Sequence, residues 1–414
     1  MLRYELKKMF GTFGGKLALV LYAVVVTFSC WLSVSGFLNY GTEWVNEHGQ
    51  QETGLTAVHK RQEAQNKWEG YVDQEMLTKV IQENTRINAT PEAQSSNVQQ
   101  KDIAFGWKQG FDPIRELINH FYAPNFRSYD YYRADGISVI SEDTFYANRI
   151  KLLKDWLYDK SDVGYSRYSE AEKEYLISQY EKLEAPFYFD YFDGWYQLLE
   201  GSVYIPSMGI LIIGFLLAGM FANEFKWKTD AIYYSTPHGR TRATAAKIKA
   251  GLLLVTVLYW TAMLIYSAFT LGYLGFEGGN CVIQFRVRKS PYNITMWQAW
   301  VLCLMGGYVG NLFLSVLTMY ISAKTKSSVI AVITPFVCLF IPSFLQGITD
   351  WLDTVVNMLP DSLLLYYQHL GTFNLITVFG KVFRALDVCL PLYTVLTVAL
   401  VPVIYREFRR KEIS

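Results

Sequence analysis

The 414-residue chain is 51% hydrophobic and only 18% charged, whereas about a quarter of a soluble globular chain is charged. The charges are segregated: residues 39–202 hold 17 basic and 27 acidic residues, a net of −10, and the other 250 residues hold 21 basic and 10 acidic ones. The formal net charge of +1 is therefore a cancellation. This composition excludes an ordinary soluble protein and predicts a membrane protein with one sizeable aqueous domain.

The N-terminal region predicts an interfacial helix followed by a first membrane span. Within residues 1–16, four apolar residues share one helical face, as in a short amphipathic helix on a membrane surface: Leu2, Leu6, Met9 and Phe10. Residues 17–38 form an apolar run of 22 residues, which is long enough to cross about 30 Å of hydrocarbon. A cleaved signal peptide is the alternative, but its apolar core usually has only about 7–15 residues.

Residues 39–202 form the aqueous domain, for which the sequence predicts a mainly helical fold. Val58–Ile81 carries apolar residues at helical spacing, and Ser169 with Glu172 forms a capping-box pattern that opens another helix. The aromatic run Phe187–Tyr196 stands just before the next apolar run. That position predicts an interfacial aromatic belt, with a binding surface for a lipid or peptide as the alternative.

Five further apolar runs complete a set of six predicted spans: 203–222, 251–276, 297–322, 328–345 and 386–405. The expected fold class is an all-α polytopic membrane protein with six transmembrane helices. A mainly helical extracellular domain is inserted between helices 1 and 2, and residues 277–296 form an extracellular loop between helices 3 and 4. An even number of spans places both termini on the same side of the membrane.

Basic residues near the span ends predict the orientation. Residues 1–16, the segment 223–250, the turn 323–327 and the tail 406–414 together hold 16 basic and five acidic residues. The short loops on the other side hold five basic residues. We therefore expect a multi-pass protein with cytoplasmic N and C termini. Because residues 39–202 contain no cysteine, a bacterial plasma membrane is favoured over a eukaryotic secretory route.

Two connecting segments are unusual. Residues 223–250 are too long for a tight turn, and they carry six basic residues: Lys226, Lys228, Arg240, Arg242, Lys247 and Lys249. This length predicts a structured cytoplasmic segment that a second protein contacts; the alternative is that the charges only satisfy the positive-inside rule. Residues 346–385 are apolar but are broken by Pro360 and Gly371, which predicts extracellular re-entrant helices in the outer leaflet.

The sequence shows no convincing catalytic, metal or nucleotide site. The five histidines lack a second ligand at metal-binding spacing and are interpreted as structural: His48, His59, His120, His238 and His369. Gly14-Gly15-Lys16 lacks the other residues of a phosphate-binding loop. The first five spans contain essentially no charged residue, which disfavours a transporter driven by protons or sodium. If a nucleotide powers this protein, another chain hydrolyses it.

Five residues of the segment 223–250 stand in a distinctive order: Glu224, Thr229, Pro237, Arg240 and Lys247. This order resembles the permease subunits of bacterial ABC transporters of the ABC-2 type. Those proteins have six spans, a short amphipathic helix before the first, and a cytoplasmic stretch with Glu, Gly-Thr, Pro-x-x-Arg and a Lys that opens the third span. Here Lys228 replaces the usual Gly. The resemblance covers residues 1–38 and 203–414, and the segment 346–385 resembles the pair of short outer helices of that family.

The resemblance implies that residues 223–250 couple the chain to an ATPase. Pro237 and Gly239 would break a helical hairpin, whose first part presents a coupling helix, and Arg240 and Arg242 would pair with carboxylates of the partner or with lipid phosphate. ATP and Mg would be bound by a separate cytoplasmic ABC ATPase subunit, and no cofactor by this chain, which would not itself be an enzyme. Further partners would be membrane lipid and a second permease subunit, in a homo- or heterodimer, but no nucleic acid.

The function implied by the resemblance is ATP-driven export of an amphiphilic substrate, namely a peptide, an antimicrobial or a lipid. A second class of function is a membrane receptor that detects extracellular peptide through residues 39–202 without transport. A third is a membrane-embedded enzyme, which the missing site disfavours.

Overall fold

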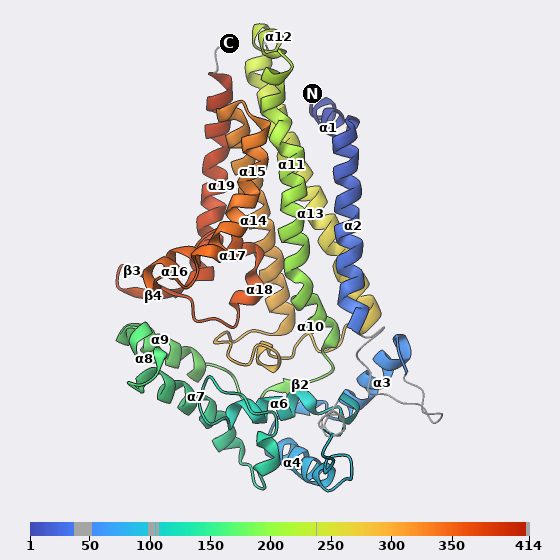
Figure 1. Ribbon diagram of the computed structural model, residues 1–414, viewed down its shortest axis with the longest axis vertical. Coiled ribbons are helices and arrows are strands. Elements are labelled where there is room, and N and C mark those ends of the chain that lie inside the picture. Colours follow the sequence, from blue (N-terminus) through green and yellow to red (C-terminus); the bar gives the residue numbers. More distant parts are fainter. Residues whose placement is uncertain (37–51, 98–103, 105–106, 237, 411–414) are drawn as a thin grey trace.

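The computed structural model describes residues 1–36, 52–97, 104, 107–236 and 238–410. Within these residues, six long helices stand side by side in a bundle (Figure 1), and each is long and apolar enough to cross a membrane. They are α2 (Phe13–Ser35), α11 (Tyr204–Lys226), α13 (Thr244–Leu274), α14 (Met296–Thr325), α15 (Ser328–Leu345) and α19 (Ala385–Arg409). The prediction of a mainly helical polytopic membrane protein with six spans is confirmed.

The two ends of the bundle differ. The N-terminus and the end of α19 lie at the end drawn at the top of Figure 1, which we call the upper end. The domain between α2 and α11 lies at the opposite, lower end, and we call it the lower domain.

Several helices continue past their apolar runs at the upper end. Helix α11 extends to Lys226, α13 begins at Thr244 and α19 ends at Arg409, whereas the apolar runs end at 222, begin at 251 and end at 405. The main chain keeps its helical hydrogen bonds after the side chains become polar. Hydropathy therefore marks where the apolar residues stop and not where the helix stops.

Small residues let the helices of the bundle approach one another closely. A Cβ atom at Gly214 of α11 would lie 2.6 Å from Cγ of Pro335 in α15. The hydroxyl of Ser322 in α14 donates a hydrogen bond of 2.6 Å to the carbonyl of Ala218 in α11. Close packing and interhelical hydrogen bonds of this kind are what hold membrane helices together, because lipid supplies no hydrophobic driving force between them.

The amphipathic helix predicted at the N-terminus is present as α1 (Leu2–Gly11) at the upper end. Its residues Leu6, Met9 and Phe10 pack, partly buried, against the core of the bundle. The hydroxyl of Thr12 accepts a hydrogen bond of 3.0 Å from the N–H of Gly15. This N-cap starts α2 earlier than the predicted boundary after residue 16.

The lower domain is mostly helical. Its helices are α3 (Leu55–Asn66), α4 (Gln74–Asn88), α6 (Asp112–Phe121), α7 (Glu142–Tyr158), α8 (Val163–Arg167), α9 (Glu170–Glu181) and α10 (Asp193–Glu200). Two short strands, β1 (Gly70–Tyr71) and β2 (Tyr188–Phe189), pair antiparallel. The capping box of Ser169 and Glu172 is present at the start of α9, as predicted.

Two predictions for the lower domain are wrong. The apolar pattern of Val58–Ile81 does not form one helix, because Gly70 has φ of +142° and Tyr71 pairs with Tyr188 between α3 and α4. The aromatic run Phe187–Tyr196 is not an exposed belt.

The aromatic run Phe187–Tyr196 is instead buried inside the protein. At most 1% of each of three of its side chains is exposed: Phe187, Phe189 and Phe192. Their rings pack around Phe285, which lies in the loop 277–296 of the bundle, with ring centres 5.3–6.3 Å apart. The run is therefore the core that joins the lower domain to the bundle.

The segment 346–385 holds three short helices and a hairpin rather than a pair of helices. They are α16 (Asp350–Val356), α17 (Asp361–Leu364), α18 (Tyr366–His369), β3 (Leu375–Val378) and β4 (Lys381–Arg384). The strands β3 and β4 pair antiparallel, with Leu375 opposite Arg384, and β4 runs directly into α19. The hairpin was not predicted, because strands of only four residues are too short to show a distinctive period.

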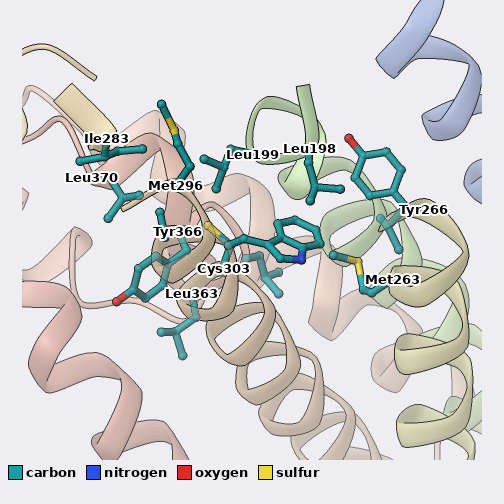
Figure 2. Packing of buried hydrophobic residues seen from close by; sticks show 14 of the residues in the cluster. Leu198, Leu199, Met263, Tyr266, Ile283, Met296, Cys303, Leu363, Tyr366 and Leu370 are labelled. Carbon is teal, nitrogen blue, oxygen red and sulfur yellow. The ribbon is translucent and has the colours of Figure 1, made fainter. Parts of the chain in front are cut away.

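The lower end of the bundle is covered by side chains from the lower domain and from the segment 346–385. Figure 2 shows Leu198 and Leu199 of α10 beside Tyr266 and Met263 of α13, with Leu363 and Tyr366 of the segment 346–385 on the other side of Cys303. All of these residues belong to one buried hydrophobic cluster. The bundle, the last helix of the lower domain and the segment 346–385 therefore share a core.

Candidate functional site

At the upper end, the structure brings together three of the predicted coupling residues, Glu224, Thr229 and Lys247. The ammonium of Lys247 is almost fully buried, with its side chain 2% exposed. It donates to Oε1 of Glu224 at 2.8 Å, to Oε2 of Glu5 at 3.0 Å and to the carbonyl of Met220 at 3.0 Å. Three acceptors satisfy the three N–H groups of this ammonium.

Glu224 is the centre of the network. Its Oε1 also accepts a hydrogen bond of 3.2 Å from Nζ of Lys8, and its Oε2 accepts one of 2.6 Å from the hydroxyl of Thr229. Burial lowers the pKa of Lys8, but the carboxylates of Glu5 and Glu224 outweigh burial, so this pKa lies above its ordinary value. Two acidic and two basic side chains thus form a neutral ion network. Each of the four has an opposite charge within 4 Å.

The ion network joins three helices that are far apart in the chain. Glu5 and Lys8 come from α1, Glu224 from α11 and Lys247 from α13. Sequence reasoning singled out Glu224 and Lys247 but missed Glu5 and Lys8 as their partners. The available signal was that α1 carries an acidic residue three positions before a basic one, which on a helix places both on the same side.

The turn after α11 shows how Lys228 serves in place of glycine. Lys228 has φ of +55°, in the left-handed region that glycine adopts without a steric cost. This conformation brings the N–H of Thr229 to within 2.9 Å of the carbonyl oxygen of Glu224. The same turn places the hydroxyl of Thr229 on the Glu224 carboxylate.

The rest of the segment folds into α12 (Asp230–Ser235) and the π-helical turn η5 (Gly239–Ala243), which leads into α13. Pro237 lies outside the described residues. Gly239 is buried, and a Cβ atom there would lie 1.7 Å from the carbonyl oxygen of Tyr233. Only glycine fits at position 239, so its sequence assignment as a helix-breaking position has a steric basis.

Arg240 and Arg242 are not equivalent. The guanidinium of Arg240 donates a hydrogen bond of 3.0 Å to the carbonyl of Arg409 in α19, and lies 4.7 Å from the ring centre of Tyr234. Arg242 is exposed. Arg240 therefore fastens the segment to this chain's own last helix, whereas the side chain of Arg242 faces outward.

An aromatic cluster makes a second attachment to α19. The hydroxyl of Tyr234 in α12 donates to the carbonyl of Phe408 at 3.1 Å. The ring of Phe408 also packs on Phe221 and Phe225 of α11, with centres 4.7 and 6.1 Å apart. No periodicity or motif in the sequence singled out Phe408, because its role depends on helices that meet only in three dimensions.

The outward face of the segment is both apolar and basic. Ile232 of α12 is 69% exposed and Trp227 is 53% exposed. Lys226, Lys228 and Arg242 are exposed as well. A basic surface with exposed apolar side chains is complementary to an acidic cleft on another protein.

Among the described residues, no group of three or more His, Cys, Asp or Glu side chains could hold a metal ion. Burial lowers the pKa of His120 to about 3 and that of His369 to about 4. Both imidazoles are therefore neutral at physiological pH. His48 lies outside the described residues.

Comparison of the chain with protein-family models and with curated proteins finds no match.

Proposed function

We propose that this protein is the transmembrane subunit of an ATP-driven exporter, and that residues 223–250 receive force from a separate ATPase. The observation that carries the proposal is the ion network of Glu5, Lys8, Glu224 and Lys247. It fastens the beginning and the end of the segment to each other and to α1. Both ends of the segment are thereby fixed to the bundle.

The proposed orientation places the upper end in the cytoplasm. The predicted inner segments hold 16 basic residues and the short loops on the other side hold five, and basic residues are retained on the cytoplasmic side of membrane proteins. In this orientation the lower domain is extracellular, and the face of α12 points toward cytoplasmic proteins. A bacterial plasma membrane is the proposed location.

The contacts support a specific mechanism of coupling. A force on α12 reaches α11 and α13 through the ion network, and reaches α19 through Tyr234 and Arg240. These three helices therefore move together with α12, because packed helices shift as units rather than deforming continuously. Closure of the ATPase on ATP would tilt these helices. The proposal includes a second permease subunit, so that two ATPase subunits act on two such segments.

The experiment is to purify the full-length chain in lipid together with an ATPase that carries a Walker A motif, and to measure ATP hydrolysis and substrate transport. We expect amphiphilic substrate to stimulate ATP hydrolysis. Ile232→Asp, on the exposed face of α12, should abolish this stimulation by placing a charge in the interface. Ile232→Leu, which keeps this face of α12 apolar, is the matched control. A chain that forms no complex with such an ATPase contradicts the proposal.

A receptor that senses an extracellular ligand is the second candidate, and one observation favours it. The lower domain packs on the hairpin β3–β4, since Leu375 is buried with Leu176 and Tyr180 of α9 in one cluster. The hairpin continues into α19, whose other end contacts residues 223–250. Transport separates the candidates: a receptor would change the activity of a signalling partner, such as a histidine kinase, without moving substrate.

A further inference from the structure

A groove of about 410 Å³ opens at the upper end between α1, α11 and α15. This volume lies within the range of about 300–1,000 Å³ typical of ligand pockets. One end of the groove is polar and is lined by Lys8, Asn223 and Trp227, with the ion network behind them. Its other wall is apolar and is lined by Phe215 of α11 with Val332 and Ile333 of α15.

The polar end offers positive charge and hydrogen-bond donors, although the ion network is neutral. The carboxylate of Glu224 is enclosed, with its side chain 8% exposed, and both of its oxygens accept hydrogen bonds. The side chain of Lys8, in contrast, is 52% exposed. Among the described residues, the side-chain amide of Asn223 has no hydrogen-bond partner. The Glu5 carboxylate and Thr12 also line the groove, but the Glu5 side chain is only 13% exposed. The main donors that the groove offers are therefore an ammonium and an amide, which suit an anionic oxygen.

Two neighbouring residues, Gly219 and Trp227, define the space and the level of the polar end of the groove. Gly219 leaves room for Asn223 along α11, because a Cβ atom at position 219 would lie 2.4 Å from Nδ2 of Asn223. Trp227 is 53% exposed at the same end, and tryptophan is enriched where a membrane helix meets water. The polar end of the groove therefore lies at the level expected for lipid headgroups.

The apolar wall belongs to helices that face lipid. Phe215 and Ile333 are each 50% exposed in the single chain, and both lie on helices that are apolar enough to cross a membrane. An amphiphile can therefore reach the groove sideways from the bilayer, with its chain along α11 and α15 and its headgroup at Lys8.

We propose that this groove binds an amphiphile with a phosphate-bearing anionic headgroup, which Lys8 and Asn223 hold while Phe215 and Ile333 contact the chain. The charge complementarity at the polar end distinguishes this occupant from a zwitterionic lipid. Binding requires no ATPase partner, so the proposal stands or fails separately from the proposed exporter function.

The test uses the purified full-length protein in nanodiscs of phosphatidylcholine. The probe is a monoacyl glycerophosphate with a photoreactive diazirine in its chain, and the labelled peptides are mapped by mass spectrometry. We expect labelling to concentrate on α11 and α15 beside the groove. A phosphocholine probe with the same chain should label these peptides about tenfold less, because its quaternary ammonium cancels the net negative charge of the headgroup and lies beside the cation of Lys8.

Two pairs of variants locate the headgroup and the chain. Lys8→Gln should lower labelling by the glycerophosphate probe about tenfold, whereas Lys7→Gln, its exposed neighbour outside the groove, should not change it. Ile333→Trp should fill the groove and abolish labelling, whereas Ile330→Trp, exposed on the same helix but outside the groove, should not. If Ile333→Trp does not fold, as judged by gel filtration, the proposal is still tested by two comparisons. One compares Lys8→Gln with Lys7→Gln, and the other compares the glycerophosphate with the phosphocholine probe.

Three outcomes would overturn the proposal. Equal labelling by the two headgroups would show a site without selectivity for a net negative headgroup. Labelling of α2 and α19 at the same level as the groove would show only the general lipid boundary. Full competition by inorganic phosphate, at the concentration of the probe, would show an anion site that does not use the acyl chain.

Discussion

Lys247 and Glu224 face each other across the upper end of the bundle, with Nζ 2.8 Å from Oε1 and both side chains largely buried. Neither charge is tolerable there without the other, because removing one partner of a buried ion pair leaves an uncompensated charge in a medium of low polarity. The pair is therefore a constraint on conformation more than a source of net stability.

Lys247→Met should destabilise the protein by about 3–5 kcal/mol, because Glu224 and Glu5 would lose their shared buried cation. The measurement is thermal unfolding in detergent. Lys249→Met, which removes an exposed charge two positions along the same helix, is the control and should have little effect. Adding Glu224→Gln to Lys247→Met should recover part of the loss. A Lys247→Met protein as stable as the control would show that the pair is not buried.

Arg240→Glu should uncouple ATP hydrolysis from transport while leaving membrane insertion intact. The substitution removes the hydrogen bond to the Arg409 carbonyl and the contact with the Tyr234 ring. Only the attachment through Tyr234 and Phe408 would remain, so the coupling of α12 to α19 would weaken. In the reconstituted complex, substrate transport should fall much more than ATP hydrolysis. Arg242→Glu should instead weaken ATPase assembly, because Arg242 is exposed. Normal transport by Arg240→Glu would refute its coupling role.

Lys228→Gly should stabilise the protein by roughly 0.5–1 kcal/mol. Relief of the left-handed conformation at φ of +55° gains about 1–2 kcal/mol, and the greater freedom of glycine in the unfolded chain costs about 0.5–1 kcal/mol. Lys249→Gly, inside α13, should instead cost about 1 kcal/mol. Thermal unfolding of both variants provides the comparison, and a loss of stability in both would exclude a left-handed residue at 228.

Asp361 should make stability fall as the pH rises from about 4 to about 7. Its side chain is 7% exposed and one of its oxygens has no hydrogen-bond partner, and burial raises the pKa of Asp361 to about 7. In the unfolded chain an aspartate titrates near pH 4. The folded protein thus binds more protons in this window, and stability is lost as they dissociate.

The check is to measure thermal unfolding at several pH values for the parent protein and for Asp361→Asn. The amide cannot ionise, so this variant should lack the decline between pH 4 and 7 and should be the more stable protein at pH 8. Asp353→Asn, in the same segment, should keep the decline. A parent protein without the decline would contradict a buried carboxyl at position 361.

The parts of the fold that depend on local sequence could be predicted, and the parts that depend on contacts across the chain could not. Six apolar runs predict six helices because each must satisfy its own backbone in lipid, and the capping box at Ser169 depends on four consecutive residues. The sequence predicted an interfacial belt from the aromatic residues around Phe187, because an aromatic run has the same composition whether lipid or protein covers it. Their actual cover, Phe285, lies about a hundred residues further along the chain.

The candidate site divides in the same way. Glu224, Thr229 and Lys247 could be singled out from their order in one segment, and the structure places them in one network. Glu5 could not be assigned to that network, because 242 residues separate it from Lys247. The short strand β4 could not be predicted either, because the pattern of its four residues fits a strand and a helix equally well.

Helix α19 is held at both of its ends. Its first residue follows the β3–β4 hairpin, which packs against the lower domain, and at its last turn the carbonyls of Phe408 and Arg409 accept hydrogen bonds from Tyr234 and Arg240. In the proposed exporter, a ligand bound on one side of the membrane would act on the other side only through a reciprocal coupling free energy. If binding to the lower domain shifts α19, then occupancy of the ATPase must change the affinity of the lower domain for that ligand by the same factor. In the proposed exporter, α19 would make sensing and driving two directions of one thermodynamic cycle.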